Sequence, residues 1–134
     1  MSFAQTLGFE RVSAPDGVVC LRARVDEGHT NMHGTAHGGF LYALADEAFA
    51  LASNAGDADA VALSVHMDYF RPVRVGDVIE VESRTEHLGR RVATYRIEVR
   101  VDASIVALFT GTVYRRPRDA DRAGAQPPAA SRRP

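Results

Sequence analysis

The sequence predicts an α+β fold, in which one apolar helix lies on a single antiparallel sheet of about five or six strands. The helix is predicted by residues 37–55, HGGFLYALADEAFALASNA, because this run is rich in alanine and leucine and is longer than a typical strand. The sheet is predicted by the other segments, which alternate apolar and polar residues between turns and leave little room for further helices.

The predicted helix is too small to cover the predicted sheet. A helix of about 18 residues is about 27 Å long, which is less than the width of such a sheet. The uncovered apolar surface predicts self-association, most simply a two-fold dimer with sheets joined edge to edge or helices packed side by side.

The composition limits the classes of protein and of chemistry. The formal net charge of -1 gives no general attraction to nucleic acid or to an anionic membrane. No apolar segment reaches the ~18 residues of a membrane-spanning helix, and the N-terminus has no signal-peptide pattern. Cys20 stands alone, which excludes an internal disulfide and fits a reducing cytoplasm. All 16 basic residues are arginines, so Schiff-base and pyridoxal-phosphate chemistry, which need a lysine amine, are excluded.

Turn residues divide the chain before the helix into short elements. The expected elements are a helical turn at residues 3–7, strands at 9–13 and 17–26, and an irregular loop at 27–36. The second strand alternates strictly, which predicts one buried and one wet face. The residues on its predicted buried face are Val19, Leu21, Ala23 and Val25.

After the helix, residues 56–59 are expected to form a link. Four strands should follow, at residues 61–70, 78–87, 92–101 and 105–114. From 117 to 134 the only apolar side chains are alanine and proline, which cannot bury enough surface to offset the entropy of ordering. We therefore predict one domain over residues 1–116 and a disordered, arginine-, proline- and alanine-rich tail over residues 117–134.

Asp46 lies in the middle of the central helix and is the first candidate for function. Apolar residues surround most of the helix, which indicates that the helix is buried. A carboxylate in such a place is costly unless it is paired, protonated or used. The alternative to a functional role is an aspartate that caps a backbone group or pairs with an arginine.

The start of the helix, His37-Gly38-Gly39, offers backbone N–H groups that no intrahelical carbonyl satisfies. The helix dipole adds positive charge there, and glycines allow a ligand oxygen to approach closely. This arrangement suits a carbonyl oxygen that becomes an oxyanion. The alternative is that the glycines only permit a tight turn into the helix.

Asp46 follows His37 by nine residues, or about 13 Å along the helix axis. One helix therefore cannot bring Gly38 and Asp46 to the same small atom, but an antiparallel helix of a neighbouring subunit can bring its Asp46 to Gly38. Asn31 and His37 flank the helix entrance and could orient a carboxylate or a water, and Ser64 could donate a hydrogen bond to Asp46; each could equally be structural.

Other sites are not expected. His29, His33 and His37 repeat every four residues, but the glycines among them argue against the continuous helix that a metal-binding face would need, so we predict no metal site. The nucleophile motif G-x-S-x-G and the phosphate-binding P-loop motif are both absent.

These residues form a pattern that resembles a known family. The segments HTN at 29–31, GTAHGG at 34–39 and LADEAFA at 44–50 resemble the hotdog-fold acyl-CoA thioesterases of the PaaI (phenylacetate-degradation) group. The segments YFRP at 69–72 and LGRR at 88–91 look like that family's next turn and hairpin. The resemblance covers about residues 7–114, and the combination of HGG with LAD is its most specific part.

The resemblance implies a hotdog fold, with one long central helix wrapped by a curved antiparallel sheet, in dimers that assemble further into tetramers with sites between subunits. It implies that Asp46 is the catalytic carboxylate and that the N–H of Gly38, preceded by His37, polarises the thioester carbonyl. By the same resemblance Asn31 would help to position water or the carboxylate, and Ser64 would support Asp46.

The expected reaction is hydrolysis of acyl-CoA thioesters, of which aryl-acetyl esters such as phenylacetyl-CoA are typical of the family. No cofactor is expected, because coenzyme A is part of the substrate, and no nucleic-acid or membrane partner is expected. The alternatives are a non-catalytic acyl-CoA-binding module and a hotdog hydratase or dehydratase. The candidate substrate-binding residues are Gly39, Phe40, Tyr42 and Phe49 near the acyl group and Arg90 and Arg91 near the nucleotide phosphates.

Overall fold

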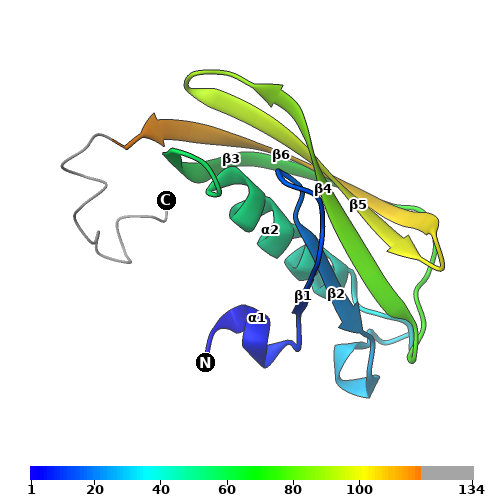
Figure 1. Cartoon of the computed structure of the whole chain (residues 1–134). Coiled ribbons are helices and arrows are strands. Elements are labelled where there is room, and N and C mark those ends of the chain that lie inside the picture. Colours follow the sequence, from blue (N-terminus) through cyan, green and yellow to red (C-terminus); the bar gives the residue numbers. More distant parts are fainter. Residues whose placement is uncertain (119–134) are drawn as a thin grey trace.

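The computed structural model describes residues 1–118 and has the predicted α+β architecture. Its elements are α1 (Phe3–Thr6), β1 (Glu10–Val12), β2 (Cys20–Arg24), the 3-10 turn η1 (Glu27–His29), α2 (Gly38–Ser53), β3 (Ala58–Tyr69), β4 (Val78–Leu88), β5 (Val92–Val101) and β6 (Ser104–Pro117). The six strands form one sheet in the order β1-β2-β4-β5-β6-β3, with antiparallel neighbours throughout. The sheet curves around α2, which lies against one of its faces (Figure 1).

The core lies between α2 and the sheet. Leu44, Ala45 and Ala48 of the helix are fully buried, which agrees with the prediction from its apolar composition. Phe49 packs on Phe109 of β6, with ring centroids 5.3 Å apart. The helix approaches β6 closely at Gly111, where a Cβ would lie 2.6 Å from the Phe49 ring, so only glycine fits there.

The alternation of residues 17–26 correctly predicts which side chains of β2 and of its two flanking residues are buried. Val19, Leu21, Ala23 and Val25 are each at most 3% exposed. The predicted loop at 27–36 is also correct in outline, since η1 and two isolated β-bridges are its only regular features within the described chain.

Two predictions about β3 are wrong in part. Residues 56–59 are not all a link, because Ala58 and Asp59 already pair with Pro117 and Arg116 of β6. The alternation of apolar residues at 61, 63, 65 and 67 is interrupted at Leu63, which is 58% exposed beside a register shift between Ala62 and Ser64, while Val65 and Met67 pack against the core.

The described chain extends slightly beyond the predicted domain end at residue 116. Strand β6 runs to Pro117, and the Arg118 guanidinium lies 2.9 Å from Asp59 Oδ1 and donates to the Gly56 carbonyl at 2.7 Å. These contacts draw residue 118 to the C-terminal end of α2. The rest of the predicted tail, residues 119–134, lies outside the described residues. None of the described helices has the length and apolar character needed to cross a membrane.

Candidate active site

The first turn of α2 leaves one backbone donor available. His37 is the N-cap, and its Nδ1 accepts a hydrogen bond from Gly39 N–H at 2.8 Å. The His37 carbonyl accepts from the N–H groups of Phe40 at 2.9 Å and Leu41 at 3.4 Å. The expectation that Gly39 also offers a free N–H is therefore wrong. Within residues 1–118, Gly38 N–H donates no hydrogen bond, and it sits at the positive end of the helix.

Neighbouring side chains explain why glycine occupies positions 38 and 39. A Cβ on Gly38 would lie 3.3 Å from the ring of Tyr69, and a Cβ on Gly39 would lie 3.0 Å from His37 Nδ1. Both contacts are tighter than an ordinary van der Waals approach. The glycines thus allow the Tyr69 ring and the His37 cap to close on the helix start, in addition to leaving the Gly38 N–H open.

Gly38 lines a pocket of about 340 Å³. Loop 31–36 forms one wall and residues 69–73 form the other; the two walls are joined by the hydrogen bond from Ala36 N–H to the Val73 carbonyl at 2.7 Å. The pocket brings together Asn31 and Gly38, two of the predicted site residues. Its other lining residues are Thr35, Ala36, Leu41, Tyr69, Phe70, Arg71, Pro72 and Val73.

Asn31 mainly holds its own loop. Its Oδ1 accepts from the N–H groups of His33 at 2.9 Å and Thr35 at 3.3 Å, and its Nδ2 donates to Thr35 Oγ1 at 3.1 Å. An amide nitrogen carries two hydrogens, so one remains after the bond to Thr35. Asn31 can therefore fix the pocket wall and still offer a donor.

Asp46 lies outside this pocket. It is half-buried on α2, about 12 Å along the helix axis from Gly38. The two residues are eight positions apart, or about two helical turns, so they lie on the same flank of the helix. Tyr42 lies between them on that flank and is 38% exposed. Burial raises the pKa of the Tyr42 hydroxyl, and the negative charge of Asp46 raises it further.

Tyr69, the last residue of β3, lies beside this flank at the start of α2. Burial raises the pKa of the Tyr69 hydroxyl, and the nearby Tyr42 raises it further. The sequence singles out Tyr69 only as part of the YFRP segment. Its role at the helix start depends on the pairing of β3 with β6, which no local pattern in the sequence reveals.

The remaining predicted residues are dispersed. Ser64 is exposed on β3, opposite Thr112. Phe49 is 2% exposed and belongs to the core, so it does not line an open acyl pocket. Phe40 is also buried; it stacks on His29 with ring centroids 3.8 Å apart, beside a second cavity of about 290 Å³ under α1.

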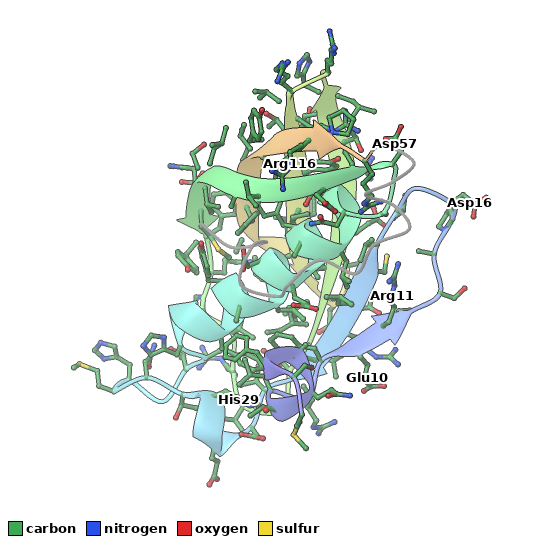
Figure 2. The ribbon with its side chains drawn as sticks, turned by 90° about the vertical axis from the view of Figure 1, so that its left-hand side faces the viewer. Glu10, Arg11, Asp16, His29, Asp57 and Arg116 are labelled. Atoms are coloured by element: carbon green, nitrogen blue, oxygen red, sulfur yellow. The ribbon has the colours of Figure 1, made fainter. Side chains whose placement is uncertain are left out.

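Arg90 and Arg91 are exposed in the hairpin between β4 and β5, at the opposite end of α2 from Gly38. Arg115 links this hairpin to that end, because it donates to the Gly89 carbonyl at 2.8 Å and lies 3.4 Å from Asp57. Figure 2 shows Asp57 and His29 at opposite ends of the helix.

The possible metal ligands among the described residues are histidine, cysteine and acidic side chains. Residues 1–118 contain no group of three or more histidine, cysteine or acidic side chains arranged to hold a metal ion. His29 Nδ1 accepts from Asp26 N–H at 3.0 Å and His37 Nδ1 caps α2, so both histidines have structural bonds.

Comparisons with known proteins identify the family of this chain. The model of the thioesterase superfamily matches residues 33–107. Acyl-coenzyme A thioesterase PaaI of Escherichia coli is 35% identical over 113 residues, which are 84% of this chain and 81% of that protein. The structure of a mutant of phenylacetic acid degradation protein PaaI from Thermus thermophilus has a TM-score of 0.78 and 51% identity, over 84% of this chain and 96% of that one.

A third relative has a ligand. The structure of a Streptococcus mutans protein bound to acetyl CoA has a TM-score of 0.77 and 29% identity, over 82% of this chain and 90% of that one. The family match covers more than half of the chain, and the E. coli and Thermus relatives match most of it. The chain therefore belongs to the thioesterase superfamily, in which it is a thioester hydrolase of the PaaI type with the hotdog fold.

Proposed function

We propose that the protein hydrolyses acyl-CoA thioesters in a site shared by two protomers. The observation that carries this proposal is the arrangement of α2, on which Gly38 N–H lacks an acceptor within residues 1–118 and Asp46 lies two turns further along the same flank. In a two-fold dimer whose α2 helices run antiparallel, Asp46 of one protomer comes beside Gly38 of the other.

The reaction follows from these two groups. The thioester carbonyl oxygen accepts from Gly38 N–H, and this bond strengthens as the oxygen gains negative charge. Asp46 either takes a proton from the water that attacks the carbonyl carbon, or attacks that carbon itself to give a mixed anhydride that water then hydrolyses. Both routes break the C–S bond and release CoA as a thiolate, which is a good leaving group and needs no strong acid.

Three residues have supporting roles in this proposal. The remaining amide hydrogen of Asn31 positions the water or the carboxylate, and Ser64 supports Asp46 with a hydrogen bond. His37 holds the helix start through its cap. No metal or cofactor takes part, and coenzyme A enters only as part of the substrate.

The proposed substrates are phenylacetyl-CoA and hydroxylated aryl-acetyl-CoA esters. Two tyrosine side chains, Tyr42 and Tyr69, flank the proposed site and suit an aromatic acyl group, and the Thermus relative is named for phenylacetic acid degradation. Arg90 and Arg91 lie at the far end of α2, so an antiparallel partner brings them to the side of Gly38, where they suit the CoA phosphates. The Streptococcus relative bound to acetyl CoA supports a CoA ester as the ligand.

The proposed assembly is a dimer of dimers in the cytoplasm. Strand β3 is at an edge of the sheet and exposes Leu63 and Tyr69, and the next residue, Phe70, is exposed as well. An edge of 12 residues with apolar side chains is suited to pairing with a second copy.

A thiol-release assay over a panel of acyl-CoA esters tests the activity. Asp46→Asn should lower kcat by at least about 100-fold because it removes the base or nucleophile. Glu47→Gln is the matched control, because it makes the same chemical change one residue away, and it should keep kcat within about twofold. An Asp46→Asn variant with full activity would contradict the mechanism, and ester binding without thiol release in the wild type would favour a binding module.

Mixing two inactive variants tests whether the site is shared. Asp46→Asn and Gly38→Val should each be inactive, because each damages both sites of a homodimer. After the subunits are mixed in equal amounts and exchanged, the heterodimer has one intact site, so roughly a quarter of the wild-type activity should return. No recovery after demonstrated subunit exchange would place both groups in the same protomer's site and contradict the proposal.

A further inference from the structure

Tyr69 connects the edge strand β3 to the first turn of α2. Its hydroxyl donates a hydrogen bond to the Gly38 carbonyl at 3.0 Å, between residues 31 positions apart in the chain. Its backbone position is fixed, because β3 ends at Tyr69 and the next N–H group, that of Phe70, donates to the Val106 carbonyl at 2.8 Å. The hydroxyl therefore comes from a residue whose backbone is held by pairing with β6.

This bond extends to the cap of the helix. The Gly38 carbonyl belongs to the same peptide group as Gly39 N–H, which donates to His37 Nδ1 at 2.8 Å. Hydrogen bonds at the two ends of one peptide group polarise it and strengthen each other. Because Nδ1 accepts, the neutral His37 ring carries its proton on Nε2.

The helix start needs such a restraint. Two adjacent glycines give this turn more conformational freedom than any other pair of residues would. A donor that stabilises an oxyanion must already point at the oxygen before the reaction, because reorienting it costs part of the stabilisation. The Tyr69 ring also touches the place where a Gly38 side chain would start, so the ring and the hydroxyl restrain the same residue from two directions.

We propose that Tyr69 is a positioning residue for thioester hydrolysis, whose hydroxyl fixes the Gly38–Gly39 peptide and thereby aims Gly38 N–H at the substrate carbonyl. This inference rests on the proposed function and assigns Tyr69 no direct part in the chemistry. The bond to the Gly38 carbonyl acts before substrate binds and should matter most when charge develops on the carbonyl oxygen. Loss of the hydroxyl should therefore lower kcat and leave KM nearly unchanged.

Tyr69→Phe tests this directly, because it keeps the ring against Gly38 and removes only the hydroxyl. We expect kcat to fall about tenfold, which is less than the loss expected when an oxyanion donor is removed outright. KM should change by less than about twofold. The matched control is Tyr95→Phe, which removes the hydroxyl of a buried tyrosine on β5 and should keep kcat within about twofold.

A second measurement separates positioning from general stability. Nitrogen NMR of the His37 ring reports which nitrogen carries the proton, and the Nε2–H form should lose population in Tyr69→Phe but not in Tyr95→Phe. If Tyr69→Phe keeps wild-type kcat, or lowers kcat no more than Tyr95→Phe does, the inference fails while the proposed function stands. If the wild type releases thiol from no ester in the panel, the proposed function fails and this inference fails with it.

Discussion

Glu98 is a charged residue that the fold buries, although it lies on the outer face of β5. Its side chain is enclosed by three arginines, Arg84, Arg96 and Arg100, and the whole residue is only 6% exposed. Burial alone would raise the pKa of Glu98. The hydrogen bond from Arg100 and the positive charges of the three arginines outweigh burial and lower the pKa below its ordinary value of 4.5.

The lowered pKa of Glu98 predicts how stability depends on pH. The ionised side chain stabilises the folded state fully above pH 4.5, and this contribution is lost as the pH falls through the lower folded-state pKa. Glu98→Gln should therefore lower the free energy of unfolding by about 1 kcal/mol at neutral pH, a modest value because the arginine heads reach solvent. Urea unfolding of both proteins should show this difference shrinking in acid, and a difference that stays constant from about pH 7 to about pH 3 would contradict the assignment.

The glycine after the N-cap offers a second test at the scale of single residues. Gly39→Ala would place a Cβ 3.0 Å from His37 Nδ1, so the cap should be lost and the free energy of unfolding should fall by about 1 kcal/mol. Gly56→Ala is the control, since a Cβ there meets nothing within 4 Å and the backbone does not need a positive φ. Equal stability of the two variants by thermal and urea unfolding would show that the cap contributes nothing.

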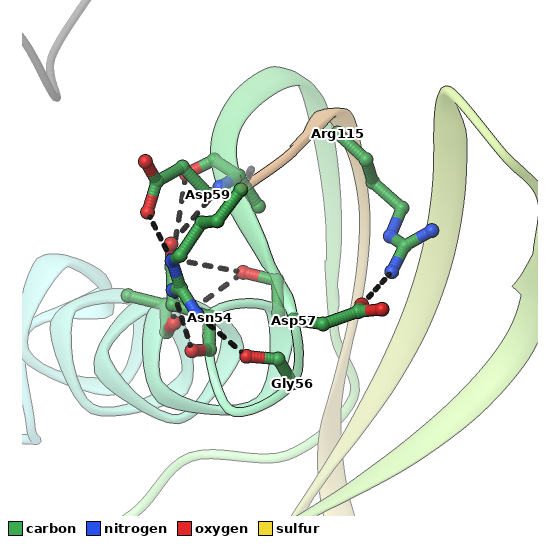
Figure 3. A network of polar contacts seen from close by, with 9 residues as sticks. Asn54, Gly56, Asp57, Asp59 and Arg115 are labelled. Carbon is green, nitrogen blue, oxygen red and sulfur yellow. Dashed lines mark hydrogen bonds and ion pairs between the residues drawn. The ribbon is translucent and has the colours of Figure 1, made fainter. Parts of the chain in front are cut away.

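At the scale of whole elements, the C-terminal end of α2 is held by the end of β6. Asn54, the C-cap, donates through Nδ2 to the Ala50 carbonyl at 3.0 Å, and its Oδ1 accepts from Ala60 N–H at 2.9 Å. Arg118 adds its contacts to Asp59 and to the Gly56 carbonyl, and Figure 3 shows how these polar groups surround the helix end. A cation close to the C-terminal end of a helix also interacts favourably with the negative end of the helix dipole.

Arg118→Ala should therefore loosen this end of the helix. We expect the free energy of unfolding to fall by about 1–2 kcal/mol, because a partly buried Asp59 and the carbonyls of Asn54 and Gly56 lose a charged donor. Arg116→Ala removes an exposed arginine from the end of β6, two residues before Arg118, and should change stability by less than about 0.5 kcal/mol (Figure 2). Hydrogen exchange should show faster opening of the last turn of α2 in Arg118→Ala only, and similar exchange in both variants would contradict this role.

The elements differ in how far the sequence alone predicts them. The helix and the buried face of β2 follow from periodicity, because each is decided by neighbours within the same segment. The exposure of Leu63 and the early start of β3 at Ala58 depend on pairing with β6, which lies about 50 residues further along the chain. The burial of Phe49 likewise depends on Gly111, so an aromatic residue expected in a pocket lies in the core.

The candidate site shows the same division. The open N–H at Gly38 follows from the predicted helix start at His37-Gly38-Gly39, whereas the capping of Gly39 N–H by His37 Nδ1 was not predicted. Tyr69 reaches Gly38 only because β3 ends beside the first turn of α2, which no local pattern predicts. Sequence reasoning therefore identifies the backbone donor at Gly38 and misses two side-chain contacts at the helix start, the cap by His37 and the hydrogen bond from Tyr69.

At the scale of the whole molecule, the proposed shared site fixes the symmetry of the dimer. If Gly38 of one α2 lies beside Asp46 of an antiparallel α2, the two-fold axis must pass midway between them, at residue 42. Tyr42 packs on Phe109 but is still 38% exposed on the flank that carries both residues, so the exposed part of its side chain can meet its symmetry mate. Packed helix axes lie about 8–10 Å apart, and each Cα lies about 2.3 Å from its own axis. At the two-fold axis, the Cα atoms of residue 42 in the two protomers face each other, so they come close enough for a disulfide.

Cross-linking tests this symmetry without relying on activity. In a Cys20→Ser background, which removes the native thiol, Tyr42→Cys should form a covalent dimer on mild oxidation. Glu47→Cys is the control, because residues five positions from the dyad are separated by about 15 Å along the antiparallel helices, too far for a disulfide. Cross-links should appear on non-reducing gels for Tyr42→Cys alone and disappear on reduction. If the protein dimerises but Tyr42→Cys does not cross-link, the helices do not meet at this position, and Gly38 and Asp46 of the two protomers cannot share a thioester.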